Sequence, residues 1–233
     1  MKKTLFPLLV ALSILSCKNA ESDKSNSEMN TKNTEVAASE EKDGIGNTIA
    51  MANGLDKFKN ATEVEFTFNV KVNDTLRSSR HWKWNTKTNE ISLTENDSTA
   101  TYTQNDSIPE SKVSIDQKFI NDSYWLLFPY QLVWSDATLT EEKEVPAPIS
   151  GDTLNKLEVS YSADGGYTPG DTYDIYYGDD HMIEEWVYKA AGGDRQMATT
   201  WEDYEEFKGI PIAKMHKSKD GSFQLYFTDI VIK

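Results

Sequence analysis

Cysteine is almost absent from this chain of 233 residues, and the single cysteine, Cys17, excludes an intrachain disulfide. Histidine is nearly as scarce. None of His81, His181 and His216 has a second histidine at a metal-binding spacing, so we expect no zinc site. The Gly-x-Ser-x-Gly motif of a hydrolase is missing too. We therefore predict no catalytic residues, no metal and no cofactor, and a protein that is not an enzyme.

Basic residues are also few: 24 Lys and Arg stand against 38 Asp and Glu, for a formal net charge of -14. Nucleic acids and anionic lipids attract basic patches, so we expect neither as an electrostatic partner. A self-repelling acidic surface favours a monomer. One group of aspartates is a candidate for calcium binding, but its spacing does not fit an EF-hand and predicts turns instead: Asp164, Asp171, Asp174, Asp179 and Asp180. The acidic run 202–206 predicts a solvated loop.

The N-terminus has the pattern of a targeting segment. Lys2 and Lys3 precede a short apolar run, and the run ends in Ile14-Leu15-Ser16-Cys17. This ending resembles the lipobox of bacterial lipoproteins, which implies that residues 1–16 are a signal peptide and that Cys17 carries acyl chains such as palmitate. The alternative is a plain secretory signal with an incidental cysteine.

Residues 17–44 contain no aromatic residue and, before Gly44, no Leu, Ile or Phe, so they predict a disordered tether between the lipidated cysteine and a folded domain over 45–233. Lys18 stands where the lipoproteins that this chain resembles carry Asp as an inner-membrane retention signal. The sequence therefore predicts a lipid anchor in the outer membrane of a Gram-negative-type envelope. It leaves the periplasmic and the surface face open.

The densest apolar stretch of the mature chain lies at 119–134, and it is too short and too polar in places to span a bilayer. We predict an amphipathic helix from Asp116 to Phe128, ended by the ring of Pro129, and then an extended exit through Tyr130, Leu132 and Trp134. A second helix is predicted from Asn47 to Phe58, weakened by Gly54.

The rest of the domain predicts antiparallel strands. Alternation is cleanest at 64–72, where Val64, Phe66, Phe68, Val70 and Val72 share one face. The domain has about eleven predicted strands in all, at intervals of roughly 8–12 residues, among them 196–204 and a strand over 207–215 with a bulge or edge at Gly209 and Pro211. The expected fold class is mainly β with a few helices: a curved antiparallel sheet in an unclosed barrel, capped by a helical lid.

Several motifs carry a resemblance to a known family: Gly54-Leu55-Asp56-Lys57-Phe58, Trp82-Lys83-Trp84, the run from Ser123 to Tyr130 and Tyr167-Thr168-Pro169-Gly170-Asp171. Over 44–233 the chain resembles the LolA/LolB superfamily of periplasmic carriers, and within it the uncharacterised envelope lipoproteins. The resemblance implies an apolar cavity, a membrane tether, and a hydrophobic ligand or lipidated partner.

Nine aromatic residues are the predicted ligand cavity: Phe66, Phe68, Trp82, Trp84, Trp125, Phe128, Tyr130, Trp134 and Trp186. The alternative is that they simply fill a core, and that the domain is a packed module which recognises another envelope protein or a glycan by its surface. Arg80 shares a face with Trp82 and Trp84. It is expected either to pair with an acidic group inside or to hold the lid closed.

Overall fold

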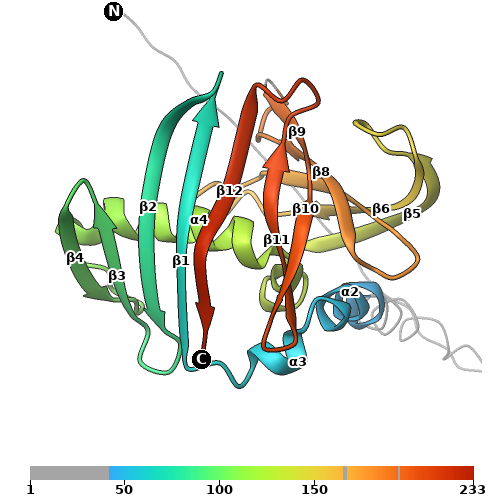
Figure 1. The fold of residues 1–233 in the computed structure, drawn as a ribbon. Coiled ribbons are helices and arrows are strands. Elements are labelled where there is room, and N and C mark those ends of the chain that lie inside the picture. Colours follow the sequence, from blue (N-terminus) through green and yellow to red (C-terminus); the bar gives the residue numbers. More distant parts are fainter. Residues whose placement is uncertain (1–41, 165–166, 194) are drawn as a thin grey trace, which may run out of the picture.

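The computed structural model describes residues 42–164, 167–193 and 195–233. The predicted signal peptide, the anchor Cys17 and most of the predicted tether lie outside these residues. Within them, twelve strands form two antiparallel sheets, one of seven strands and one of five, and a long helix packs between them (Figure 1). The predicted fold class is confirmed: the protein is mainly β, and its sheets do not close into a barrel.

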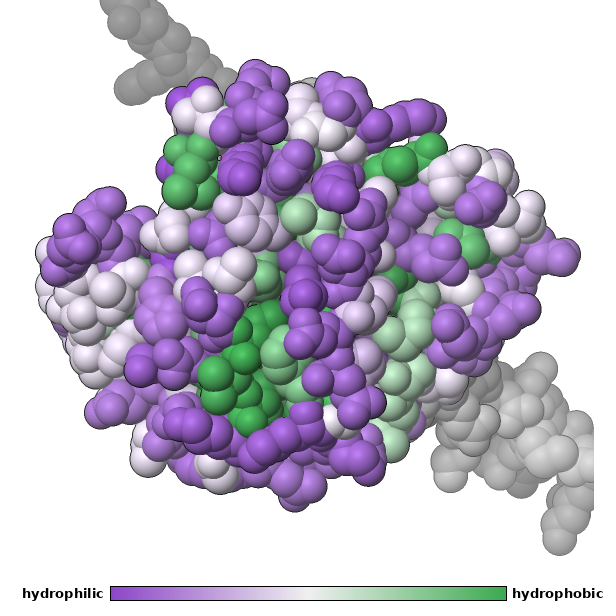
Figure 2. Space-filling model, viewed as in Figure 1, coloured by the Kyte–Doolittle hydropathy of each residue, from purple (hydrophilic) through white to green (hydrophobic). Residues whose placement is uncertain are grey.

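The larger sheet has the strand order β10-β11-β12-β1-β2-β3-β4. Its strands are β1 (Glu63–Val72), β2 (Thr75–Asn85), β3 (Glu90–Glu95), β4 (Ser98–Thr103), β10 (Glu202–Phe207), β11 (Ile210–Lys217) and β12 (Phe223–Ile232). Alternation buries Val64, Phe66 and Phe68 on its inner face, each at most 2% exposed. Hydrophilic residues cover most of its outer face, with apolar areas among them (Figure 2).

The smaller sheet is a meander in chain order, from β5 to β9. Its strands are β5 (Thr138–Pro146), β6 (Thr153–Ser160), β7 (Thr172–Tyr177), β8 (Ile183–Lys189) and β9 (Gln196–Thr200). Leu157, Ile175 and Trp186 form a buried row across β6, β7 and β8 in register. One face of this sheet therefore meets the helix.

Helix α4 (Glu110–Trp134) contacts both sheets. The ring of Phe119 lies 5.4 Å from the ring of Trp82 on β2, and the ring of Trp125 lies 4.1 Å from that of Trp186 on β8. Three short helical segments precede β1: the π-helical η1 (Lys42–Gly46), α2 (Asn47–Ala52) and α3 (Leu55–Phe58). The core is thus built around α4, with side chains from both sheets closing on it.

The predicted extended exit after Pro129 is wrong, because α4 continues to Trp134. Leu127 has non-helical angles (φ -121°, ψ 22°), so the helix is kinked just before the proline rather than ended by it. Tyr130 and Leu132 are both 1% exposed beyond the kink. Their burial outweighs the backbone hydrogen bond that proline removes.

The predicted helix over 47–58 divides at Gly54, whose φ of 85° is left-handed. The predicted strand 196–204 divides at Trp201. Its first part, β9, belongs to the small sheet and its second part, β10, to the large one, so the chain changes sheets there. This division makes twelve strands instead of eleven.

The predicted loop at 202–206 is wrong, since these residues form β10, and the hydroxyl of Tyr204 donates to the carbonyl of Ile183 at 2.8 Å.

The expected bulge at Gly209 is instead a tight hairpin turn. Lys208 and Gly209 have φ of 54° and 79°. A two-residue hairpin loop with a type I′ turn requires positive φ at both of its central residues. β10 and β11 are consecutive strands joined by this turn.

Candidate functional site

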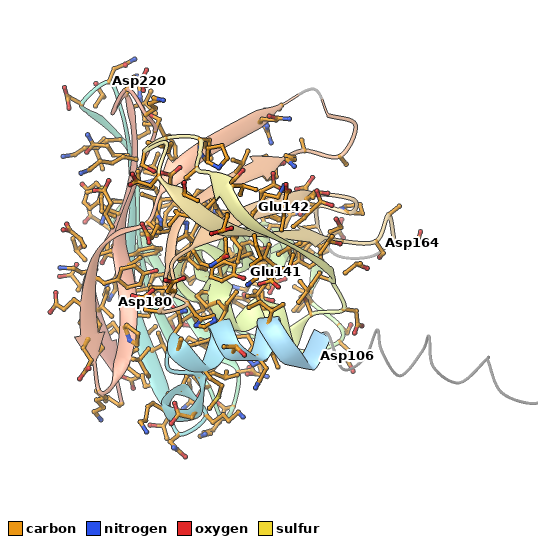
Figure 3. The ribbon with its side chains drawn as sticks, turned by 90° about the vertical axis from the view of Figure 1, so that its right-hand side faces the viewer. Asp106, Glu141, Glu142, Asp164, Asp180 and Asp220 are labelled. Carbon is orange, nitrogen blue, oxygen red and sulfur yellow. The ribbon has the colours of Figure 1, made fainter. Side chains whose placement is uncertain are left out.

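A cavity of about 1070 Å³ lies between α4 and the five-stranded sheet. Four parts of the chain form its wall. They are α4 (Gln117, Ile120, Asn121, Ser123, Tyr124, Trp125, Gln131) with Asp136 beyond it, the β6–β7 connection (Tyr161, Ser162, Asp164, Tyr167, Thr168, Pro169, Asp171), β7 and β8 (Tyr173, Trp186, Tyr188), and β9 with the residue before it (Arg195, Gln196, Met197). In the side view of Figure 3, Asp164 lies on the side of the molecule away from the seven-stranded sheet.

Aromatic rings form the inner wall of this cavity. The ring of Tyr124 lies 5.2 Å from that of Tyr173 and 6.3 Å from that of Tyr161, in tilted and edge-to-face arrangements. Trp125 and Trp186 pack at 4.1 Å, and Trp186 lies 5.2 Å from Tyr173. Such ring contacts hold one another in place, so the wall is preformed.

The tyrosine hydroxyls of this wall are its hydrogen-bonding groups. The hydroxyl of Tyr124 donates to that of Tyr161 at 3.0 Å. Burial raises the pKa of Tyr124 and of Tyr173 above the ordinary value for tyrosine, so both stay protonated at physiological pH. Arg195 donates to the hydroxyl of Tyr188 at 3.2 Å. The wall therefore offers hydroxyl groups as well as ring faces.

Tyr167 ties the β6–β7 connection to α4. Its hydroxyl donates to Asp116 Oδ2 at 2.6 Å, while Tyr102 and Gln104 donate to Oδ1 of the same carboxylate, each at 2.9 Å. The hydrogen bond to Asp116 raises the pKa of Tyr167 to about 12, so the hydroxyl keeps the proton that it donates. One edge of the cavity is thereby fixed to the helix.

A buried ion pair fixes α4 to the larger sheet. Arg80 donates from Nε and Nη2 to the two carboxylate oxygens of Asp122, both at 2.6 Å, and Trp82 Nε1 donates to Oδ2 at 2.8 Å. Burial raises the pKa of Asp122, whose side chain is fully buried, while the guanidinium opposes this shift. Asp122 is the acidic partner that the position of Arg80 predicts.

The structure divides the nine predicted cavity residues into three groups. Trp125 and Trp186 line the large cavity. Trp84 and Trp134 line a second cavity of about 330 Å³ beside Phe58. The other five, Phe66, Phe68, Trp82, Phe128 and Tyr130, lie in the core, each at most 2% exposed, and are absent from the walls of both cavities. The large cavity therefore lies on the opposite side of α4 from the inner face of the seven-stranded sheet.

Sequence reasoning missed the five tyrosines of the wall: Tyr124, Tyr161, Tyr167, Tyr173 and Tyr188. Tyr173 and Tyr188 stand directly opposite each other on β7 and β8, so alternation within those strands was the available signal.

The histidines lie on separate elements, and within 42–164, 167–193 and 195–233 no group of three or more His, Cys, Asp and Glu is placed to hold a metal ion. No helix in those ranges is both long and apolar enough to cross a membrane.

The fold is similar to several solved structures at low sequence identity. A DUF1329 family protein from Desulfovibrio piger is 9% identical with a TM-score of 0.47, covering 81% of this chain and 93% of that one. A LolA superfamily protein from Nitrosomonas europaea is 11% identical with a TM-score of 0.45 and the same coverage. Lipoprotein LppX from Mycobacterium tuberculosis is 11% identical, with a TM-score of 0.29 and 78% and 93% covered.

These likenesses concern the fold alone, and every TM-score among them is below 0.5. No protein-family model matches the sequence, and a search of curated proteins found no match. The cavity itself is therefore the main indication of function.

Proposed function

We propose that the protein is a cell-envelope lipoprotein, held on the outer membrane through Cys17, which binds a hydrophobic ligand in the cavity between α4 and the small sheet. The ligand class is an acyl chain, a lipid or a lipidated partner, and the proposed role is in the transport of lipids or lipoproteins. The cavity of about 1070 Å³ carries this proposal, because it slightly exceeds the roughly 300–1,000 Å³ of common ligand pockets and so has room for a ligand of that class.

The composition of the cavity wall supports the proposal. Trp125, Trp186 and five tyrosines line it, and Ile120 and Met197 add aliphatic side chains. Removing such surface from water is favourable by about 25 cal/mol per Å². An apolar segment of a ligand gains this free energy when it enters.

The binding test uses the Cys17→Ser chain and a fluorescent acyl probe. We expect Ile120→Trp to weaken uptake of the probe at least tenfold, because Ile120 lines the cavity and is 39% exposed, so a larger side chain occupies space there. Val133→Trp is the matched control: Val133 is an exposed aliphatic residue of the same helix, 42% exposed, outside the cavity wall. Absence of uptake by the parent chain would favour the alternative, a module that recognises an envelope protein or a glycan through its surface.

The anchor is tested separately by metabolic labelling with palmitate in a Gram-negative host. We expect the wild-type chain to incorporate label and to fractionate with the outer membrane, and the Cys17→Ser chain to do neither. Equal labelling of the two chains would contradict the anchor without bearing on the cavity.

A further inference from the structure

The second cavity, of about 330 Å³, has no part in the proposed function. Three parts of the chain form its wall: the end of α3 with the residues after it (Phe58, Lys59, Ala61), the end of β2 with the turn after it (Trp84, Thr86, Lys87), and Trp134 at the end of α4. Thr86 joins the first two parts, since its hydroxyl donates to the carbonyl of Ala61 at 2.5 Å and its backbone N–H to the carbonyl of Thr62 at 3.1 Å. The wall is therefore preformed.

One side of this cavity is aromatic and open to solvent. Trp134 is 46% exposed, and its ring lies 5.6 Å from that of Phe58 and 5.2 Å from that of Tyr130. The ring of Trp84, a partly buried residue, lies 6.2 Å from that of Phe58. These contacts hold the indole of Trp134 in place while part of it stays in water. A ligand therefore has direct access to the exposed part of this ring.

Two lysines lie on the same wall. Lys59 and Lys87 are both exposed, so their ammonium groups are open to a ligand. Lys87 Nζ donates to the carbonyl oxygen of Lys59 at 3.3 Å, which holds this ammonium group next to the Lys59 backbone. An ammonium group has three N–H donors, so the others remain for a second acceptor. Within the described ranges, no carboxylate lines this cavity.

The carboxylates close to this segment in the sequence are engaged elsewhere. Asp56 and Glu63 pair with other lysines, at 2.8 Å and 2.7 Å, and Asp136 lines the large cavity. The wall of the second cavity thus carries positive charge in a chain whose formal net charge is -14. Because physiological salt largely screens exposed charges beyond about 8 Å, the local sign decides which ligand charge the cavity attracts.

We infer that the second cavity binds a small anion with a flat apolar body, an aromatic carboxylate. The ring of such a ligand packs against the exposed part of Trp134, and its carboxylate accepts from Lys59 and Lys87. A volume of about 330 Å³ is at the low end of the roughly 300–1,000 Å³ of ligand pockets, so it suits a ligand of one or two rings. An organic cation also packs on indole rings, but here it meets two ammonium groups. The inference goes beyond the proposed function and uses none of its cavity residues.

The test compares three probes that share a naphthalene ring: 2-naphthoate, 2-naphthalenemethanol and 2-naphthylmethylammonium. Each is titrated into the Cys17→Ser chain at low ionic strength, and binding is followed by calorimetry. We expect 2-naphthoate to bind about tenfold more tightly than the alcohol, and the ammonium probe to bind most weakly. Added salt should weaken 2-naphthoate and leave the alcohol unchanged, because only the anion pairs with the lysines.

Substitutions assign the contacts. Lys59→Gln combined with Lys87→Gln should weaken 2-naphthoate about tenfold and leave the alcohol unchanged, since two charges are removed and no ring is touched. Trp134→Ala should weaken both probes, because both pack on the indole. Lys219→Gln is the matched control: Lys219 is an exposed lysine at the turn between β11 and β12, outside the cavity wall, and its loss should change no affinity.

The outcomes separate this inference from the proposed function. Equal affinities for the three probes, or 2-naphthoate binding that survives the loss of both lysines, overturn the anion site. Loss of 2-naphthoate binding in Ile120→Trp places the probe in the large cavity and overturns it as well. Binding of none of the three probes overturns this inference alone, because uptake of the acyl probe tests the large cavity independently.

Discussion

At the scale of single residues, His216 shows how far the interior sets the charge of a side chain. It is fully buried on β11, with its ring 4.5 Å from Trp201, 5.2 Å from Trp125 and 5.9 Å from Phe227. Its Nδ1 lies 3.3 Å from the carbonyl oxygen of Thr200, and Nε2 has no partner among the described residues. Desolvation lowers the pKa of His216 to about 3, so the ring is neutral at physiological pH.

The stability of the protein should therefore depend on pH through His216. In the unfolded chain an ordinary histidine takes up a proton near pH 6.5, whereas in the fold it does so only near pH 3. The unfolded state binds more protons in this window, so the stabilisation is present above pH 6.5 and falls as the pH decreases towards 3. From pH 7.5 to 5.5 we expect a loss of about 1 kcal/mol.

Urea unfolding of wild type and His216→Phe at the two pH values measures this contribution. The variant has no titrating ring at this position, so its free energy of unfolding should change less between pH 7.5 and 5.5, by about 1 kcal/mol. The comparison between chains cancels the carboxylates that both share. Parallel pH profiles for the two chains would show that His216 does not set the slope.

At the scale of elements, α4 shows that local sequence rules can predict that a helix exists but not where it ends. The predicted helix over 116–128 is confirmed as the middle of α4, because its apolar residues are dense and its breakers are few. The predicted C-terminal end of the helix was wrong. The effect of Pro129 on its own backbone can be read from the local sequence, but the burial of Tyr130 and Leu132 depends on partners that are distant in the chain. Tyr130, for instance, donates to the carbonyl of Asn53 at 2.8 Å, a contact across 77 positions that no periodicity reveals.

The connection between α2 and α3 depends on one glycine for its backbone conformation and its packing. Gly54 has a φ of 85°, and a Cβ placed there would lie 3.0 Å from the carbonyl oxygen of Gly209 and 3.0 Å from Cα of Ile210. Both neighbours are backbone atoms of the β10–β11 turn. The helical segments before β1 therefore pack closely on the large sheet only because this position has no side chain.

Gly54→Ala should consequently destabilise the fold by about 2–3 kcal/mol, since the left-handed backbone costs about 1 kcal/mol and the turn must shift as well. Gly151→Ala is the matched control. Gly151 has a φ of 79° and nothing within 4 Å of its added Cβ, so it should show only the backbone cost of about 1 kcal/mol. Thermal unfolding of the two variants beside wild type measures the difference. Equal losses would mean that the contact with the turn has no role.

At the scale of the whole molecule, the sequence predicted a curved sheet and a hollow, but not where the hollow lies. Turn signals and alternation are local, so most strands could be located. The pairing of β1 with β12, which sets Val64 opposite Ile232, joins opposite ends of the domain, and β10 and β11 join the same sheet, so the chain changes sheets at Trp201. Phe66 and Trp82 were expected to face the cavity. They lie in the core instead, where α4 packs against the large sheet with the ring of Phe119 5.4 Å from that of Trp82.

A cavity between α4 and the small sheet predicts that ligand binding stabilises the domain as a whole, since α4 also holds the large sheet through Asp122. A ligand at 100 times its Kd, bound only by the folded state, adds about 2.7 kcal/mol. For a domain of this size that should raise Tm by about 5–10 °C.

The measurement is a thermal unfolding series of the Cys17→Ser chain with increasing decyl maltoside below its critical micelle concentration, beside Ile120→Trp and Val133→Trp. Ile120→Trp should lose the rise in Tm, because its side chain occupies the cavity, and Val133→Trp should keep it. Equal rises in both variants would place the bound amphiphile outside the cavity. A single transition that moves as one unit is expected, because the ring contacts of Phe119 and Trp125 join both sheets to the same helix.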